Sequence, residues 1–434
     1  MTKRKIPVAS PSLGDEELES LRRTLLSKWV TQGPRVAEFE SHFAAWTGAP
    51  HACAVSSGTA ALHLALKAVG VKPGDAVITV SHSFIATANA IRHCGAEPVF
   101  VDIDEHTLNL SPERLGEVLE RDFEHRDESL WYGDTRRLAV GESPWVGREA
   151  SCGRLAAILV VHQLGMPCDL ARILPIARKW NIPVVEDAAC AIGSEILWQG
   201  TWQSVGAPHG DVACFSFHPR KVITTGDGGM LTTRQASHDE LFRLLRQHGM
   251  GTSDLVRHAA SSVVFEEYLT TGFNYRLTDL QAALGCAQLV RLPEILRRRR
   301  ALAALYRSAL AGIPGVSPPW EPDYARSNWQ SFAVRLDDHR LQRPLMQTML
   351  DAGISTRRGV MCSHLERPYR AAWDQGTLPV SERMTNSCVI LPLFADLSDN
   401  DVLRVVETLS SAIRMLDKTR PAASSSAALQ PEAA

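Results

Sequence analysis

The middle of the chain reads Ser216-Phe217-His218-Pro219-Arg220-Lys221-Val222-Ile223-Thr224-Thr225-Gly226-Asp227-Gly228-Gly229. The apolar residues up to Phe217 predict a strand, and Pro219 marks a turn after it. Lys221 stands between that turn and a glycine-rich strand entry. A lysine held beside a buried strand is desolvated, which favours the neutral amine and makes it a good Schiff-base nucleophile. The run alone is equally compatible with a basic residue beside a tight turn.

A second pattern lies upstream, where the β-branched run at residues 182–185 ends in Glu186 and Asp187. If this run is a parallel strand, its carboxyl end places Asp187 in the crevice where open α/β sheets bind ligands. Pyridoxal 5′-phosphate (PLP) requires such an acid, because a carboxylate facing the ring nitrogen keeps the ring protonated and able to act as an electron sink. The alternative is that Asp187 only caps the next helix.

A third pattern joins a predicted strand at residues 52–56 to an Ala/Leu-rich helix through Ser57, Gly58 and Thr59. Backbone N–H groups at a helix N-terminus, with hydroxyls beside them, form a natural phosphate site. Gly58 lets the backbone approach a ligand closely. Small residues before a helix are common, so this pattern indicates a phosphate site only in combination with the patterns at Lys221 and Asp187.

Strand and helix patterns alternate between residues 52 and 233, which predicts an α/β protein with a mostly parallel sheet covered on both faces. The predicted strands are residues 52–56, 76–80, 98–103, 155–161, 183–186, 212–217 and 230–232, and the helices between them include 59–69, 87–94 and 170–180. A long helix is expected from Asp279 to about Arg307, followed by strands at 332–336 and 354–356 and a last helix at 399–416.

A phosphate cup, an acid at a strand end and then a lysine follow one another in the order found in fold-type I PLP enzymes. At this point the chain resembles the DegT/StrS-type sugar aminotransferases, which aminate keto-sugars attached to nucleotides. The resemblance covers most of the chain and rests on residues 30–34, 57–59, 86–90, 98–104, 186–189, 216–221, 274–279 and 391–393. It implies the aspartate-aminotransferase-like fold, with a smaller C-terminal α/β domain after the large PLP-binding domain.

The resemblance also implies site residues. Lys221 would hold PLP covalently and Asp187 would face its ring nitrogen, while Ser216 would bind the phosphate together with Ser57, Gly58 and Thr59. His82 falls where the family stacks an aromatic ring on the cofactor, although a buried structural histidine is a close alternative. Asn274 aligns with an asparagine that reaches the neighbouring subunit's phosphate site, or else belongs to the start of the next helix. Substrate contacts are expected from Thr31, Gln32, Gly33, Arg357, Arg358 and His364.

Three residues depart from the family pattern. Cys190 stands where relatives carry Gln or His near the cofactor hydroxyl, and a thiol is a weak donor. Leu164 stands where a tyrosine is common, which changes the substrate pocket. Arg357 and Arg358 replace a His/Tyr-rich loop, and adjacent arginines either bind a diphosphate or carboxylate or are solvated charges at a strand end.

The expected domains are a large PLP-binding domain at residues 1–290, a small domain at 291–417 and a disordered tail at 418–434. Two stretches, at about 120–153 and 195–210, interrupt the large domain. Both carry tryptophans and little periodicity, so they are interpreted as surface insertions, with a substrate-covering role as the alternative.

Composition is that of an ordinary enzyme. The net charge of −2 gives no reason to expect nucleic acid or an anionic membrane as a partner. Nine cysteines without CxxC spacing predict a reducing, cytoplasmic environment and no metal site. No apolar run approaches the ~18 residues of a membrane-spanning helix. The family resemblance adds an expected homodimer with shared active sites.

The predicted function is transfer of an amino group from glutamate or glutamine to a 3- or 4-keto-sugar nucleotide, with pyridoxamine phosphate formed between the two halves of the reaction. A cyclitol ketone is the alternative acceptor, and a PLP-binding regulator without turnover is the alternative class. Lys221 argues against the dehydratase branch of the family, which has His at that position. The absence of Gly-x-Gly-x-x-Gly after the first strand argues against a nicotinamide dehydrogenase.

Overall fold

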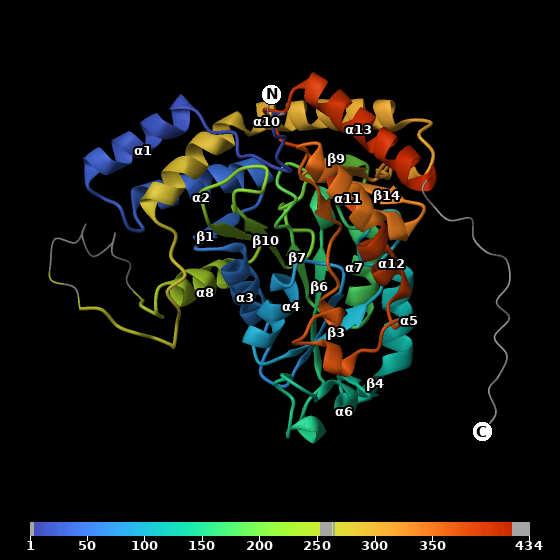
Figure 1. Cartoon of the computed structure of the whole chain (residues 1–434). Helices are drawn as coiled ribbons and strands as arrows, with labels where there is room; N and C mark the ends of the chain where they lie inside the picture. The colour runs from blue at the N-terminus through green and yellow to red at the C-terminus, as the bar shows by residue number, and fades with distance from the viewer. Residues whose placement is uncertain (1–3, 252–262, 264, 419–434) are drawn as a thin grey trace, which may run out of the picture.

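A computed structural model of the chain describes residues 4–251, 263 and 265–418. Its centre is a seven-stranded sheet (Figure 1). The strand order is β1 (His51–Val55), β11 (Gly229–Thr233), β10 (Val212–Ser216), β7 (Val184–Asp187), β6 (Leu155–Val161), β2 (Ala76–Val80) and β3 (Glu97–Val101). Within this sheet only β11 runs antiparallel to its neighbours. The predicted α/β class with a mostly parallel sheet is confirmed.

The strands of this sheet are buried on both faces, which is why they read as nearly continuous apolar runs. In β10, Val212 and Cys214 pack on one face, and Ala213 and Phe215 pack on the other. The first face is covered by α3 (Gly58–Ala68), α4 (Ala86–His93) and α8 (Ala236–Arg246). The second face is covered by α2 (Pro34–Thr47), α5 (Pro112–Asp122), α7 (Leu170–Lys179) and the first part of α10 (Asp279–Leu310).

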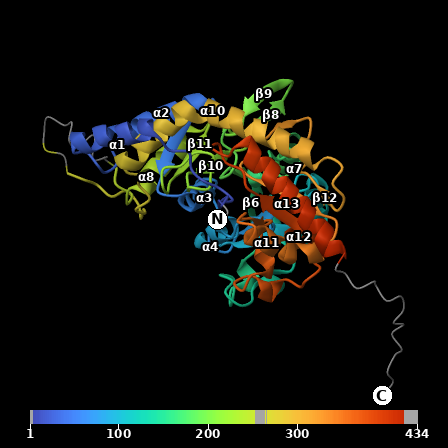
Figure 2. The ribbon, with the colours of Figure 1, turned by 45° about the horizontal axis from the view of Figure 1, so that its top comes forward.

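Helix α10 connects the large sheet to a smaller one. It begins with a capping box in which Thr278 and Gln281 bond each other's backbone N–H groups. Figures 1 and 2 show it running along one side of the molecule, from α1 (Asp15–Ser27) and α2 to α13 (Asp399–Lys418). The expected domain boundary after residue 290 falls inside this helix.

The smaller sheet has the order β12 (Val316–Ser317), β14 (Phe332–Leu336), β16 (Cys388–Leu391) and β15 (Arg357–Arg358). It packs with α11 (Gln342–Asp351) and α13 around its own apolar cluster. The N-terminal segment joins this part of the molecule, because Ile6 forms a parallel bridge with Ile354. The predicted strand at 354–356 is therefore wrong in its bounds, since the paired strand β15 begins three residues later.

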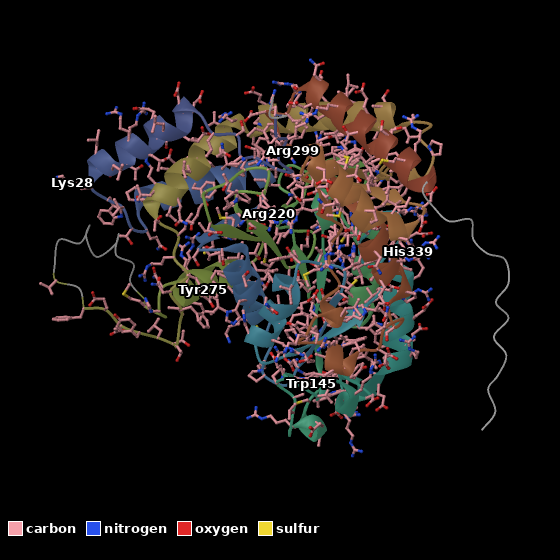
Figure 3. All side chains as sticks on the ribbon, in the orientation of Figure 1. Lys28, Trp145, Arg220, Tyr275, Arg299 and His339 are labelled. Carbon is pink, nitrogen blue, oxygen red and sulfur yellow. The ribbon has the colours of Figure 1, made fainter. Side chains whose placement is uncertain are left out.

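The two expected insertions are folded. The first contains a hairpin, β4 (Phe123–Arg126) and β5 (Ser129–Tyr132), and the short helix α6 (Thr135–Leu138). Its Trp145 is fully buried, at the end of the molecule away from α10 (Figure 3), so this stretch is not a surface excursion throughout. The second forms the hairpin β8 (Glu195–Trp198) and β9 (Thr201–Ser204), which pairs with β13 (Ala325–Arg326).

The predicted tail lies outside the described residues, apart from Lys418 at the end of α13. Among the helices that the structure describes, none combines the length and apolarity needed to cross a bilayer.

Candidate active site

A cavity of about 420 Å³ opens at the carboxyl edge of the large sheet. Parallel strands end together at one edge, so residues far apart in sequence meet there. The cavity is lined by residues at or just after the ends of β1, β2, β6, β7 and β10, namely Ser57, Phe84, His162, Asp187 and Ser216. The smaller sheet closes the opposite wall with Arg357, Arg358, Ile390 and Leu391.

The residues predicted to form a phosphate cup line this cavity. Ser57 is the N-cap of α3 and accepts a hydrogen bond from the Ala60 N–H at 3.1 Å. A methyl group added to Gly58 would lie 2.8 Å from Cβ of Ser216, so only glycine allows α3 to approach β10 this closely. The hydroxyls of Ser57, Thr59 and Ser216 and the N-terminal N–H groups of α3 thus converge on one wall, as a bound phosphate requires.

Asp187 ends β7 with its side chain almost wholly buried. Burial raises the pKa of Asp187, while donation from Oγ1 of Thr87 at 2.8 Å, the N–H of Ala189 at 3.1 Å and the charge of Lys221 counteract part of that rise. A buried carboxylate facing a cavity is a fitting partner for a cationic ring nitrogen, because an opposite charge offsets its desolvation.

Glu186, beside Asp187 on β7, supports the site from the other face of the strand. Its Oε2 lies 3.0 Å from Nε2 of His162, whose Nδ1 accepts from the Cys168 N–H at 3.0 Å. This bonding assigns the ring proton to Nε2. Oε1 of Glu186 accepts from the N–H groups of His209 and Gly210, so the second insertion is bonded to the same carboxylate that orients His162.

Lys221 lies in the cavity wall after the turn at His218, whose carbonyl accepts from the Lys221 N–H at 2.8 Å. Its Nζ is 3.1 Å from Sγ of Cys190, which also lines the cavity. The structure therefore brings Lys221, Asp187, Cys190, Ser216 and the cup at residues 57–59 into one cavity.

Neither of the two histidines predicted for the site lines the cavity. The side chain of His82 has no exposed surface, whereas Phe84, two residues further on, is 61% exposed and forms part of the wall. His364 is also fully buried, because its ring nitrogens face Oγ of Ser81 at 2.6 Å and Oε1 of Glu382 at 3.2 Å. Burial lowers the pKa of both histidines, that of His82 to about 4.

Residues 31–33 and Asn274 are also outside the chain's own cavity. The Gly33 N–H donates to Oδ1 of Asp279 at 2.8 Å, and the Asp279 N–H donates to the Thr31 carbonyl. Gln32 donates to Oε1 of Gln247 at 3.4 Å, and Gln247 is the bridge partner of Asn274. The two predicted groups therefore share one region, near the start of α10.

The other residues that depart from the expected pattern also line the cavity. Arg357 and Arg358 are exposed there, and a guanidinium nitrogen of Arg358 is 3.6 Å from Oε1 of Glu366. Leu164 lines the cavity in a left-handed conformation with φ of 56°. Arg220, at the centre of the view in Figure 3, is a further cavity residue that sequence reasoning did not single out.

Comparison with known proteins identifies the family. The DegT/DnrJ/EryC1/StrS aminotransferase family model matches residues 11–410. The chain is 34% identical to the spore coat polysaccharide biosynthesis protein SpsC of Bacillus subtilis, over 95% of this chain and 98% of that protein. Its structure is similar to that of the aminotransferase TlmJ from Streptoalloteichus hindustanus, with a TM-score of 0.79 and 32% identity over 95% of this chain and 100% of that one.

A further similar structure is the pyridoxamine phosphate form of Spr1654, a putative sugar aminotransferase from Streptococcus pneumoniae. The match has a TM-score of 0.81 and 26% identity, and it covers 95% of this chain and 100% of the Spr1654 chain. The cavity described above supplies a phosphate cup, a buried acid and an amine in one place, and these fit the cofactor of that family. The chain belongs to the DegT/DnrJ/EryC1/StrS family and is a PLP-dependent aminotransferase of the sugar-aminating type.

Proposed function

We propose that the enzyme moves an amino group from glutamate or glutamine to a keto-sugar nucleotide. The observation that carries this proposal is the pair of exposed arginines, Arg357 and Arg358, at the mouth of the cavity that holds Lys221. Adjacent guanidinium groups suit a diphosphate, because each presents a planar fork to phosphate oxygens. The similarity to a polysaccharide biosynthesis protein supports a sugar acceptor.

The chain's own residues have distinct roles in this proposal. Ser57, Gly58, Thr59 and Ser216 hold the cofactor phosphate, Asp187 keeps the ring nitrogen protonated, and Phe84 covers a ring face in place of His82. When bound, PLP supplies the electron sink that stabilises the carbanion at the donor Cα. Nζ of Lys221 takes the proton from that Cα as a general base.

The acceptor can be tested by comparing 3-keto and 4-keto sugar nucleotides with cyclitol ketones. We expect Arg357→Ala/Arg358→Ala to raise KM for the nucleotide ketones about 10- to 100-fold, the range for losing one or two charge-assisted contacts. The half-reaction with glutamate is expected to stay within about twofold, because the amino acid carries no diphosphate.

Arg114→Ala, an exposed arginine on α5 bonded to Glu117, is the matched control for lost surface charge. If the enzyme turns over a cyclitol ketone but no sugar nucleotide, and the double variant has an unchanged KM for that ketone, the acceptor belongs to the cyclitol class. A protein that binds PLP but turns over no ketone would be the regulator instead.

We also propose that two copies share their active sites. The segment before Asn274 carries exposed apolar side chains, with Phe265 85% exposed and Val263, Tyr268 and Leu269 close to it in sequence. Figure 1 shows this yellow segment reaching away from the body beside α8. Large apolar side chains gathered on such a segment are typical of an interface. Asn274 then serves the partner's phosphate cup, since it does not line its own.

Mixed dimers test this sharing. Lys221→Ala and Asn274→Asp are each expected to be inactive, the second because a carboxylate would repel the cofactor phosphate. Reassembled from a 1:1 mixture, half of the dimers are mixed and each has one intact site, so roughly a quarter of wild-type activity is expected. Mixing that restores nothing, in a preparation shown by native mass spectrometry to contain the mixed dimer, would contradict shared sites.

A further inference from the structure

Cys190 differs from the other cysteines in its surroundings. All nine cysteines fall within the described residues, none is in a disulfide, and eight are buried, whereas Cys190 is partly exposed and lines the cavity. Its Sγ is 3.1 Å from Nζ of Lys221. The most accessible thiol of the chain therefore faces the amine on which the reaction depends.

Residues 328–330 bind the backbone at Cys190 and the backbone next to Lys221. Nδ2 of Asn328 donates to the carbonyls of Cys190 and Ile192, each at 2.8 Å. Nε2 of Gln330 donates to the carbonyl of Arg220 at 2.7 Å, one residue before Lys221. Asn328 has no exposed surface, and its bond to the Ile192 carbonyl is buried. The sulfur and the nitrogen are thus kept near each other by the fold.

The chemistry of the pair follows from that proximity. The thiolate is the form of cysteine that reacts with peroxide. The product is a sulfenic acid, which condenses with a nearby nucleophile.

We propose that Cys190 and Lys221 form an oxidative modification site that closes by a covalent S–N bond. Hydrogen peroxide converts the Cys190 thiolate to the sulfenic acid, so that sulfur is oxidised and one peroxide oxygen leaves as water. The lone pair of the neutral Nζ then attacks sulfur, the S–N bond forms, the S–O bond breaks, and the departing hydroxide takes the amine proton as water. The linked protein lacks two hydrogens, and a thiol reductant restores both residues.

The consequence rests on the proposed role of Lys221. An Nζ bonded to sulfur cannot hold the cofactor, so oxidation would switch the enzyme off without destroying it. The free amine needed for the link exists in the cofactor-free protein and in the form that holds the cofactor as pyridoxamine phosphate, in which Lys221 is not bonded to it.

The test uses the cofactor-free full chain treated with hydrogen peroxide, digested without reductant and examined by mass spectrometry. We expect a joined pair of peptides containing Cys190 and Lys221, about 2 Da lighter than their sum, which disappears after treatment with dithiothreitol. Cys190→Ser should give no joined peptide. Cys152→Ser, which replaces a buried cysteine that does not line the cavity, should behave like the wild type.

Lys221→Ala provides an independent measurement, because it removes the attacking nitrogen but leaves the thiol. Its Cys190 sulfenic acid should persist and be trapped by dimedone, whereas little dimedone adduct is expected in the wild type. Equal trapping in both proteins, or sulfinic acid at Cys190 with no joined peptide, overturns the proposal.

Loading with PLP separates this inference from the proposed function. If Lys221 holds the cofactor, the loaded protein should resist joining, and adding glutamate should restore it. Joining at an equal rate in loaded and cofactor-free protein would show that another lysine holds PLP, while the S–N link itself would stand. If no joined peptide forms in either the loaded or the cofactor-free protein, while borohydride still fixes PLP to Lys221, the S–N link is refuted and the proposed function stands.

Discussion

The Lys221→Ala variant will show no measurable transamination, with kcat lowered by at least roughly 10³-fold. General acid–base catalysis alone contributes about 10²–10⁴-fold, and this variant also loses the covalent attachment of PLP. The amine lines the same cavity as residues 57–59 and Asp187, and among the described residues no other lysine lines it. The measurement is steady-state turnover, together with borohydride reduction of the PLP-loaded protein followed by mass spectrometry.

Lys72→Ala, an exposed lysine before β2, is the control for a lost positive charge and should keep both activity and borohydride fixation. If PLP remained covalently fixed in Lys221→Ala, a different lysine would be the attachment site. Circular dichroism of the variant should match the wild type, because Nζ of Lys221 bonds only to Cys190 within the described chain.

The Asp187→Asn variant will retain the fold but lose about 10²–10³-fold in kcat, the magnitude found when a preorganised electrostatic partner is removed. An amide cannot keep the cofactor ring nitrogen protonated, so the ring withdraws electrons less strongly from the reacting carbon. Thr87→Val is the graded comparison. It removes only the hydroxyl that donates to Asp187 at 2.8 Å, and a loss of about tenfold is expected.

The acid also predicts how cofactor binding depends on pH. In the cofactor-free protein the pKa of Asp187 is raised by burial, and a bound ring cation would lower it. Affinity for PLP should therefore be full above that raised pKa and decline as the pH falls through it, because the protonated carboxyl cannot pair with the cation. Fluorescence titrations across the acidic range measure this decline, which Asp187→Asn should abolish. The helix-capping alternative for Asp187 is wrong, because no helix lies among the described residues between β7 and β8. A variant with wild-type turnover would leave Asp187 a structural role only, as the acceptor from Thr87 and the Ala189 N–H.

Much of the cavity could be predicted because its residues are tied to strand ends. Asp187 and Ser216 each end a short apolar run, and parallel strands bring such ends together without further information. Gly58 could be predicted because it also follows a strand end. The contact that requires glycine there, with Ser216, joins segments far apart in sequence and could not be predicted.

The misplaced residues depend on contacts that local pattern does not encode. His82 and Phe84 are two positions apart, and nothing in their spacing tells which ring reaches the cavity. His364 is buried because Ser81 and Glu382 form hydrogen bonds with its two ring nitrogens, and the sequence pattern around His364 does not reveal these partners. Trp145 lies in a charged stretch without periodicity, and it is buried only because the chain folds back onto the large core.

The antiparallel strand β11 has a consequence for the order in which the molecule can be built. Among the described strands, β1 pairs only with β11, so Val55 has no strand partner until Gly229 has been synthesised, and its bridge to Arg276 forms later still. Contacts between such distant segments are costly to close and slow folding. On the ribosome, β2, β3 and β6 are complete long before the cup at residues 57–59 can settle against Ser216. The part of the sheet formed by β1, β11 and β10, which carries residues 57–59 and Ser216, is therefore the part that a nascent chain completes last. Newly made protein gains the capacity to bind PLP only after the parallel half has formed.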